Sequence, residues 1–162
     1  MKNIHTASKI CSRDEARRRV SLWQSQGEQV VFSNGCFDIP HLGHVDYLEK
    51  ARNIGDRLVI GLNTDASVRR LKGEERPIND EVNRARLIAS FEFVDAVVLF
   101  DEPTPLELIT LLEPDVLVKG NDYSIDTIVG AKEVLASGGK VETIELVEGY
   151  STTNIIEKIK KL

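Results

Sequence analysis

The sequence has few cysteines and no long apolar run. Its 162 residues include two cysteines, Cys11 and Cys36, whose spacing fits neither a disulfide framework nor a metal site. No apolar run approaches the ~18 residues that a membrane-spanning helix needs. The N-terminal segment MKNIHTASK lacks the apolar stretch of a signal peptide. The sequence therefore predicts a cytoplasmic location and no membrane partner.

An excess of positive charge is also missing. The formal net charge is −5, so no domain-wide basic field is available to attract a phosphate backbone, which argues against a nucleic-acid partner. Basic residues still gather at residues 13–19, 69–76 and 158–161. We interpret the first and last of these clusters as solvated helix faces.

The common phosphate-binding loops are absent. No G-x-G-x-x-G follows the first apolar run of the chain. Gly139 and Lys140 come nearest to a Walker loop, but Val134 stands where its first glycine belongs and Val141 where it needs Ser or Thr. These absences disfavour a P-loop kinase and an ordinary dinucleotide enzyme.

Apolar runs instead alternate with helical patterns. Runs rich in Val, Ile and Leu without period-2 polarity are typical of strands buried on both faces of a parallel sheet. They lie at residues 29–33, 56–63, 95–100, 115–120 and 140–146. Helical spacing of apolar residues predicts helices at residues 45–55, 80–93, 105–113 and 130–139. Ser12 and Glu15 form a capping box that predicts an earlier helix through Trp23.

This alternation predicts an α/β fold, a Rossmann-like doubly wound five-stranded parallel sheet with helices on both faces. We expect a single domain over residues 1–162, with a helical extension at residues 1–28 and an α/β core at residues 29–162.

Ligands of open parallel sheets bind beyond the carboxyl ends of the strands. The first predicted strand runs into FSNGCFDIPHLGH, which holds two of the three histidines, His41 and His44. At i and i+3 of a helix start, both rings face one side and can donate to one anionic group. Gly35 and Gly43 remove side chains where a phosphate or a base must approach the backbone. Metal binding by the pair stays open, although Asp38 is the only carboxylate in the stretch.

That segment resembles the first signature of the H-x-G-H nucleotidyltransferase superfamily, and EGYSTTN at residues 148–154 is similar to the second. Within the superfamily, the chain is most similar to the adenylyltransferase half of the bifunctional heptose-phosphate kinase/adenylyltransferases of lipopolysaccharide synthesis. The likeness covers nearly the whole chain and is carried by SNGCFDIPHLGH, RLKGEERPI, PDVLVKGNDY and EGYSTTNII, in that order. With no kinase half, the chain resembles a stand-alone adenylyltransferase.

The resemblance implies three catalytic residues, His41, His44 and Lys72, the last in a basic segment at residues 69–76 that we expect to act as a mobile lid. It also implies a set of nucleotide-binding residues: Asn34, Gly35, Cys36, Phe37, Asp38, Gly43, Arg84, Lys119, Gly120, Asp122, Ser151, Thr152 and Thr153.

Several of these residues also have structural interpretations. The lid segment could be a solvated basic stretch, and Arg84 could form a surface pair with Asp80. Residues 119–122 could be a plain turn, and N-capping of a helix would account for one of the three hydroxyls at residues 151–153.

The resemblance implies transfer of AMP from ATP to a sugar 1-phosphate, D-glycero-D-manno-heptose 1-phosphate, giving ADP-heptose and pyrophosphate. ATP is then a co-substrate, and Mg²⁺ is bound mainly through the substrate phosphates rather than at a protein metal site. Because the second pKa of such a phosphate is about 6, its oxygen can attack without a general base.

Two other functions stay open, a cytidylyltransferase acting on glycerol 3-phosphate or another small alcohol phosphate, and a non-catalytic nucleotide sensor. Leu146 and Val147 stand where cytidylyltransferases carry an arginine, which favours ATP over CTP. Pro40 replaces the usual leucine of the first signature and has no functional interpretation. A homodimer is also left open.

Overall fold

The computed structural model describes residues 5–162 and contains one sheet of five parallel strands in the order β3-β2-β1-β4-β5. The order reverses between β1 and β4, which places the expected ligand crevice there. The parallel pairing confirms the predicted doubly wound sheet. The strands are β1 (Val30–Gly35), β2 (Arg57–Asn63), β3 (Ala96–Phe100), β4 (Val116–Gly120) and β5 (Lys140–Ile144).

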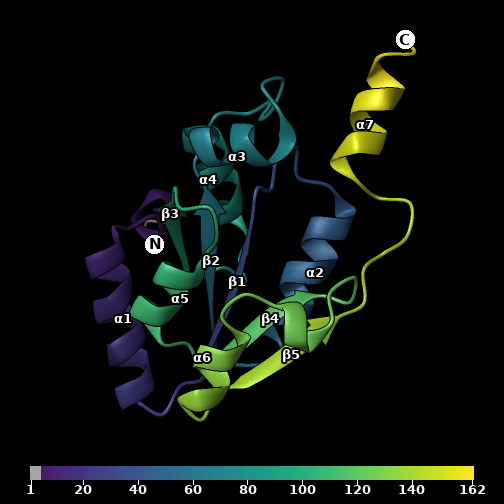
Figure 1. Cartoon of the computed structure of the whole chain (residues 1–162). Coiled ribbons are helices and arrows are strands. Elements are labelled where there is room, and N and C mark those ends of the chain that lie inside the picture. Colours follow the sequence, from purple (N-terminus) through teal and green to yellow (C-terminus); the bar gives the residue numbers. More distant parts are fainter. Residues whose placement is uncertain (1–4) are drawn as a thin grey trace.

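Seven α-helices connect or flank the strands (Figure 1). They are α1 (Arg13–Ser25), α2 (Leu42–Arg52), α3 (Asp65–Lys72), α4 (Glu81–Ser90), α5 (Leu106–Leu112), α6 (Ala131–Ala136) and α7 (Thr152–Ile159). Two 3-10 turns, η1 (Thr6–Lys9) and η2 (Ile125–Thr127), complete the elements. Within residues 5–162 no helix combines the length and apolar character needed to cross a membrane.

Apolar side chains form one core on each face of the sheet. Alternate residues of a strand point to opposite faces, so Val31 packs in the core covered by α2 and α4, whereas Val30 and Phe32 pack in the core covered by α1, α5 and α6. Figure 1 shows α1 and α5 together on one side of the sheet and α2 on the other.

The helix predicted from the capping box is α1. The hydroxyl of Ser12 accepts a hydrogen bond from the backbone N–H of Glu15, at 3.2 Å. Ala16 and Val20 of α1 are fully buried against the sheet. Of the segment predicted as an extension, residues 1–4 lie outside the described part of the chain.

The basic residues of α1 form the predicted solvated face only in part: Arg18 is exposed, whereas two arginines pair with distant segments. Arg13 pairs with Glu102 and Arg17 with Glu113, both at 2.5 Å. These ion pairs join α1 to the segments after β3 and α5. The C-terminal lysines at residues 158–161 are exposed, as predicted.

The last strand departs from the prediction. The sequence run at residues 140–146 predicted a strand buried on both faces, but β5 ends at Ile144 and is largely exposed. Because β5 lies at the edge of the sheet, no strand formed by residues 5–162 pairs with its outer side, and Lys140, Glu142 and Thr143 face solvent.

Candidate active site

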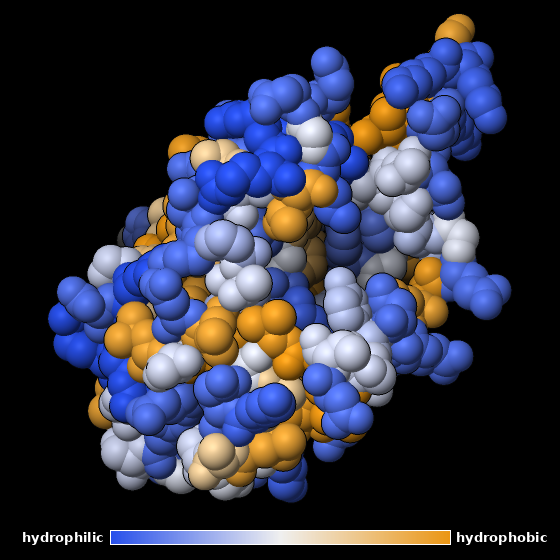
Figure 2. All heavy atoms as spheres, in the orientation of Figure 1, coloured by the Kyte–Doolittle hydropathy of each residue, from blue (hydrophilic) through white to orange (hydrophobic). Residues whose placement is uncertain are grey.

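A cavity of about 620 Å³ lies at the carboxyl edge of the sheet. Figure 2 shows this face hollowed between the main body and the base of α7. Every predicted site residue except Arg84 lines it: Asn34, Gly35, Cys36, Phe37, Asp38, His41, Gly43, His44, Lys72, Lys119, Gly120, Asp122, Ser151, Thr152 and Thr153.

The two histidines form a stacked pair at the start of α2. His41 is the N-cap residue of this helix, and the centroids of the His41 and His44 rings lie 3.7 Å apart with the ring planes at 23°. The edge of Phe37 supports His44 at a centroid distance of 5.3 Å. A side chain at Gly43 would come within 3.0 Å of the His41 ring, so the glycine between the histidines permits this stacking.

Both imidazoles are neutral at neutral pH. Burial lowers the pKa of His44 to about 4, and the neighbouring His41 adds to this effect. Burial also lowers the pKa of His41. The Nδ1 atoms of both rings are buried and have no hydrogen-bond partner within residues 5–162. The site therefore holds two uncharged rings with free hydrogen-bonding capacity.

The start of α7 lies beside this pair. A side chain at Gly43 would also come within 3.2 Å of Tyr150 Cβ. The Ser151 hydroxyl caps α7 by accepting from the Asn154 N–H, at 3.0 Å, and Thr152 Oγ1 donates to the Asp38 carbonyl, at 2.6 Å. Of the three hydroxyls at residues 151–153, that of Ser151 is used in capping and that of Thr152 in the bond to Asp38, while Thr153 is exposed.

The carboxylate of Asp38 is already engaged by groups of the protein itself, and its predicted contact with the nucleotide stays a prediction. It accepts hydrogen bonds from the N–H groups of Ile78 (2.7 Å) and Asn79 (3.0 Å) and pairs with Arg76 (2.9 Å). Burial acts to raise the pKa of Asp38, but the two N–H donors and Arg76 outweigh it and lower the pKa. Asp38 therefore fastens the loop before α4 to the site.

Arg84 is the one predicted site residue outside the cavity lining. Its side chain is fully buried and donates to the carbonyls of Asn79 (2.9 Å), Cys36 (2.8 Å) and Asn63 (2.8 Å). It also pairs with Asp65, at 2.7 Å. This arrangement rules out the surface pair with Asp80, because the guanidinium is buried and bonded to groups of the protein itself. The phosphate contact stays a prediction.

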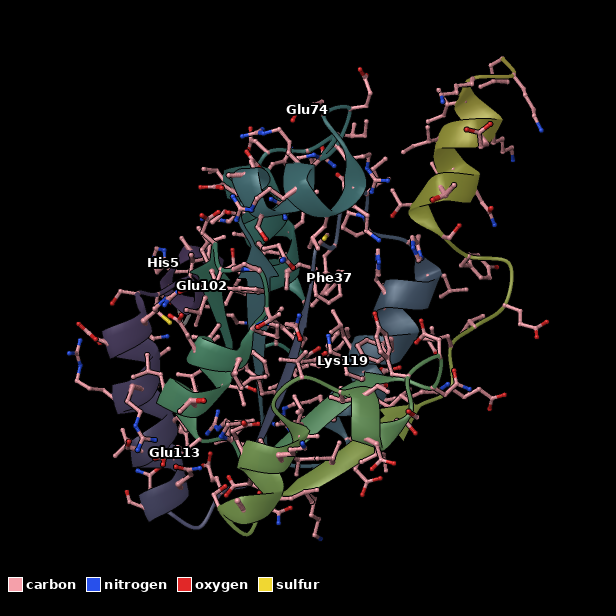
Figure 3. All side chains as sticks on the ribbon, in the orientation of Figure 1. His5, Phe37, Glu74, Glu102, Glu113 and Lys119 are labelled. Atoms are coloured by element: carbon pink, nitrogen blue, oxygen red, sulfur yellow. The ribbon has the colours of Figure 1, made fainter. Side chains whose placement is uncertain are left out.

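The predicted basic lid is only partly a loop. Residues up to Lys72 belong to the last turn of α3, and the loop begins at Gly73, whose φ of 96° favours glycine. Lys72 is exposed and lines the cavity. Figure 3 shows Glu74 at the outer tip of this loop, away from the cavity.

Hydrogen exchange tests the lid. We expect the amides of residues 69–76 to gain protection when ATP and Mg²⁺ bind, because a segment held by few buried contacts opens easily until phosphates engage its basic groups. The amides of α1 serve as the internal control, since α1 lies away from the cavity lining. Equal protection of residues 69–76 with and without ATP would contradict the lid.

Lys119 extends from the end of β4 into the cavity. Its ammonium donates to the Asn34 carbonyl over 3.4 Å and lies 5.8 Å from the centre of the Tyr123 ring. Burial lowers the pKa of Lys119 to about 8, although Asp122 opposes this shift. A side chain at Gly120 would come within 2.6 Å of the Asp122 carboxylate, so Asp122 would have to shift to admit one.

Sequence reasoning missed part of the lining. Asn63 and Phe100 are the last residues of β2 and β3, so the carboxyl-edge rule could have found them. Tyr123 and Tyr150 lie inside segments that the family resemblance already singled out. Leu71 and Arg76 also lie in such a segment, RLKGEERPI, and Leu146 and Val147 were already noted for the choice of nucleotide. No local signal marked the remainder, which is Tyr47, Pro103 and Pro105.

A doubly wound parallel sheet whose carboxyl-edge cavity meets the N-termini of two helices is typical of nucleotide-binding α/β proteins. The Cytidylyltransferase-like family model matches residues 32–158. The chain belongs to the Cytidylyltransferase-like family.

Known proteins similar to this chain include two called bifunctional protein HldE. That of Methylobacillus flagellatus is 57% identical over 153 residues, and that of Citrifermentans bemidjiense is 57% identical over 152 residues. Each match covers 94% of this chain and 31% of the relative, so the chain spans about a third of the length of these curated relatives.

A solved structure, the lipopolysaccharide core biosynthesis protein from Thermoplasma volcanium, is 30% identical with a TM-score of 0.60. That match covers 77% of this chain and all of the other.

Proposed function

We propose that this protein transfers AMP from ATP to D-glycero-D-manno-heptose 1-phosphate, forming ADP-heptose and pyrophosphate. The observation that carries the proposal is the stacked pair of neutral histidines, with free ring nitrogens, between the start of α2 and the start of α7. The similarity to the bifunctional HldE proteins, together with the resemblance of the four motif segments to heptose-phosphate adenylyltransferases, supports the heptose acceptor.

The reaction needs alignment and charge stabilisation more than proton transfer. A phosphate oxygen of the sugar 1-phosphate attacks the α-phosphorus of ATP, and the bond from that phosphorus to the bridging oxygen breaks, so that pyrophosphate leaves with the electron pair. His41 and His44 donate hydrogen bonds to the phosphoryl oxygens on which charge builds. Lys72, at the cavity mouth, neutralises the departing pyrophosphate.

We propose that Mg²⁺ enters the site bound to the triphosphate, where it neutralises phosphate charge. Mg²⁺ keeps several waters and is commonly held through substrate phosphates. Within residues 5–162 no three His, Cys, Asp or Glu side chains gather as a metal site.

ATP is the proposed nucleotide because of the lining after β5. Leu146, which is 41% exposed, and Val147 present apolar surface to the cavity at the position where cytidylyltransferases carry an arginine. Apolar side chains suit the face of a purine ring and offer no charged donor for cytosine.

A panel of substrates tests the function. Pyrophosphate release should be fastest with ATP and heptose 1-phosphate among all pairings of ATP, CTP and GTP with heptose 1-phosphate and glycerol 3-phosphate. The His44→Ala variant serves as the background control. Fastest release from CTP with glycerol 3-phosphate would support the cytidylyltransferase alternative, and ATP binding without release from any acceptor would support a nucleotide sensor.

We further propose that ATP and the sugar phosphate are the physiological partners, that nucleic acid is not one, and that the protein works in the cytoplasm. The net charge of −5 supports the proposal that nucleic acid is not a partner. A homodimer is a separate proposal, and sedimentation analysis with and without ATP would test it.

A further inference from the structure

The cavity reaches both faces of the sheet. Val116 and Val118 of β4 point into the core covered by α2 and α4, and Leu117 points into the opposite core. Because side chains alternate along a strand, Lys119 points to the face of α5 and α6. The same alternation in β1 sends Asn34 to that face, away from the histidines on α2.

The two strands separate at this point. Their pairing covers only Val31 with Val116 and Phe32 with Leu117. Beyond it, the Tyr47 hydroxyl bridges the gap by bonding the Ser33 hydroxyl (2.8 Å) and the Val118 carbonyl (3.1 Å). The crevice at the switch point therefore opens to both faces of the sheet.

In the half of the crevice on the α5 face, two polar side chains lack full hydrogen-bond or charge partners within residues 5–162. The Oδ1 atom of Asn34 is buried and accepts no hydrogen bond within residues 5–162. The largely buried Lys119 ammonium forms no ion pair among the same residues, and its one hydrogen bond is the long contact with the Asn34 carbonyl. An unpaired buried charge and an orphaned acceptor are both costly. A ligand that carries both an anion and a hydroxyl would satisfy the two together.

The remaining walls of this half are mainly apolar. Phe100, Pro103 and Pro105 line it from β3 and the loop that follows, and Tyr123 closes the side next to Lys119. Figure 3 shows Lys119 and Phe37 in the centre of the molecule, between the α5 side and α2. Apolar walls around a few polar groups are typical of a small-ligand site.

We propose that Asn34 and Lys119 bind the acceptor of the reaction, so that the sugar 1-phosphate occupies the α5 face while the ATP triphosphate occupies the α2 face. The Lys119 ammonium pairs with the acceptor phosphate, and Asn34 Oδ1 accepts a hydrogen bond from a sugar hydroxyl. Gly35 and Gly120, which end β1 and β4, carry no side chain where the two substrates meet. The inference rests on the proposed function and assigns to the acceptor two residues that the family resemblance placed with the nucleotide.

Steady-state kinetics and ATP binding together test this assignment. For Lys119→Met and Asn34→Ala, we expect KM for heptose 1-phosphate to rise roughly 10- to 100-fold, the scale of losing a hydrogen bond to a charged group. The Kd for ATP, measured by calorimetry without acceptor, should stay within about twofold. Lys119→Arg, which keeps the charge, should recover part of the loss. Lys132→Met, at an exposed position of α6 outside the cavity lining, is the matched control.

A weaker ATP Kd with an unchanged acceptor KM would overturn the inference and return both residues to the nucleotide, leaving the proposed function intact. An unchanged KM for heptose 1-phosphate together with an unchanged Kd for ATP would overturn the inference as well. Should Lys119→Met fail to fold, Asn34→Ala and Lys119→Arg carry the test. A wild-type protein that binds ATP and turns over no sugar 1-phosphate would refute the proposed function itself.

Discussion

Replacing His41 or His44 by alanine is expected to lower kcat by about 10²–10³, the scale of removing one preorganised donor from a transition state. Both rings line the cavity and lie 3.7 Å apart, so both can reach one phosphoryl group. The double variant should therefore lose less than the product of the two single losses. Single-turnover measurements with saturating ATP would isolate this step.

Substitution by asparagine or glutamine separates charge stabilisation from acid–base catalysis. Both amides keep a donor but cannot take up a proton, so they should restore part of the lost rate. The pKa of His44, lowered to about 4, keeps the free ring neutral above that pH, which suits a donor at neutral pH. If raising the pH rescued the alanine variants while neither amide did, the pair would act as a base instead.

Replacing Arg84 by methionine is expected to lower the free energy of unfolding by about 3–5 kcal/mol, the usual effect of breaking a buried ion pair. The variant leaves the carbonyls of Cys36 and Asn63 without their donor and Asp65 without its partner. Urea denaturation monitored by circular dichroism would measure the loss.

Arg86→Met is the matched control for this variant, because Arg86 lies on the same helix and is exposed. We expect it to change stability by no more than about 0.5 kcal/mol. Arg84→Lys should fall between the two, since an ammonium cannot reproduce the fork of a guanidinium. Equal stability of Arg84→Met and Arg86→Met, together with a raised KM for ATP, would instead support the phosphate contact that the family resemblance implied.

Short-range patterns were enough to predict the sheet and most of the cavity. The apolar runs that became β1 and β4 are continuous because both faces of these strands are covered, and this pattern is visible in the sequence. The carboxyl-edge rule then led directly to His41 and His44, since the motif that holds them follows β1. The i, i+3 spacing predicted that both rings face one side, but not that they stack, because His41 is the extended N-cap residue of α2.

The edge strand and the basic lid were predicted less well, for a physical reason. Whether β5 is buried depends on what lies beside it, and no segment pairs with its outer side among the described residues. Residues 69–72 looked like a loop because of their charge, but the Thr64 hydroxyl caps α3 by accepting from the Ser67 N–H, at 3.2 Å. That cap let a short, highly charged helix form where charge density alone suggested disorder.

The sequence by itself determined that a parallel sheet forms, that the histidine motif follows its first strand, and which glycines flank that motif. Only the tertiary structure decided the roles of the Arg84 guanidinium and the Asp38 carboxylate, whose partners lie 5–48 and 38–41 residues away along the chain. It also decided that Asn34 and Lys119 share a face opposite the histidines. The local sequence pattern around a residue predicts whether it lies in a helix or a strand. Its hydrogen-bond partners depend instead on how distant strands pair, and the pairing of β1 with β4 brings together residues 85 positions apart.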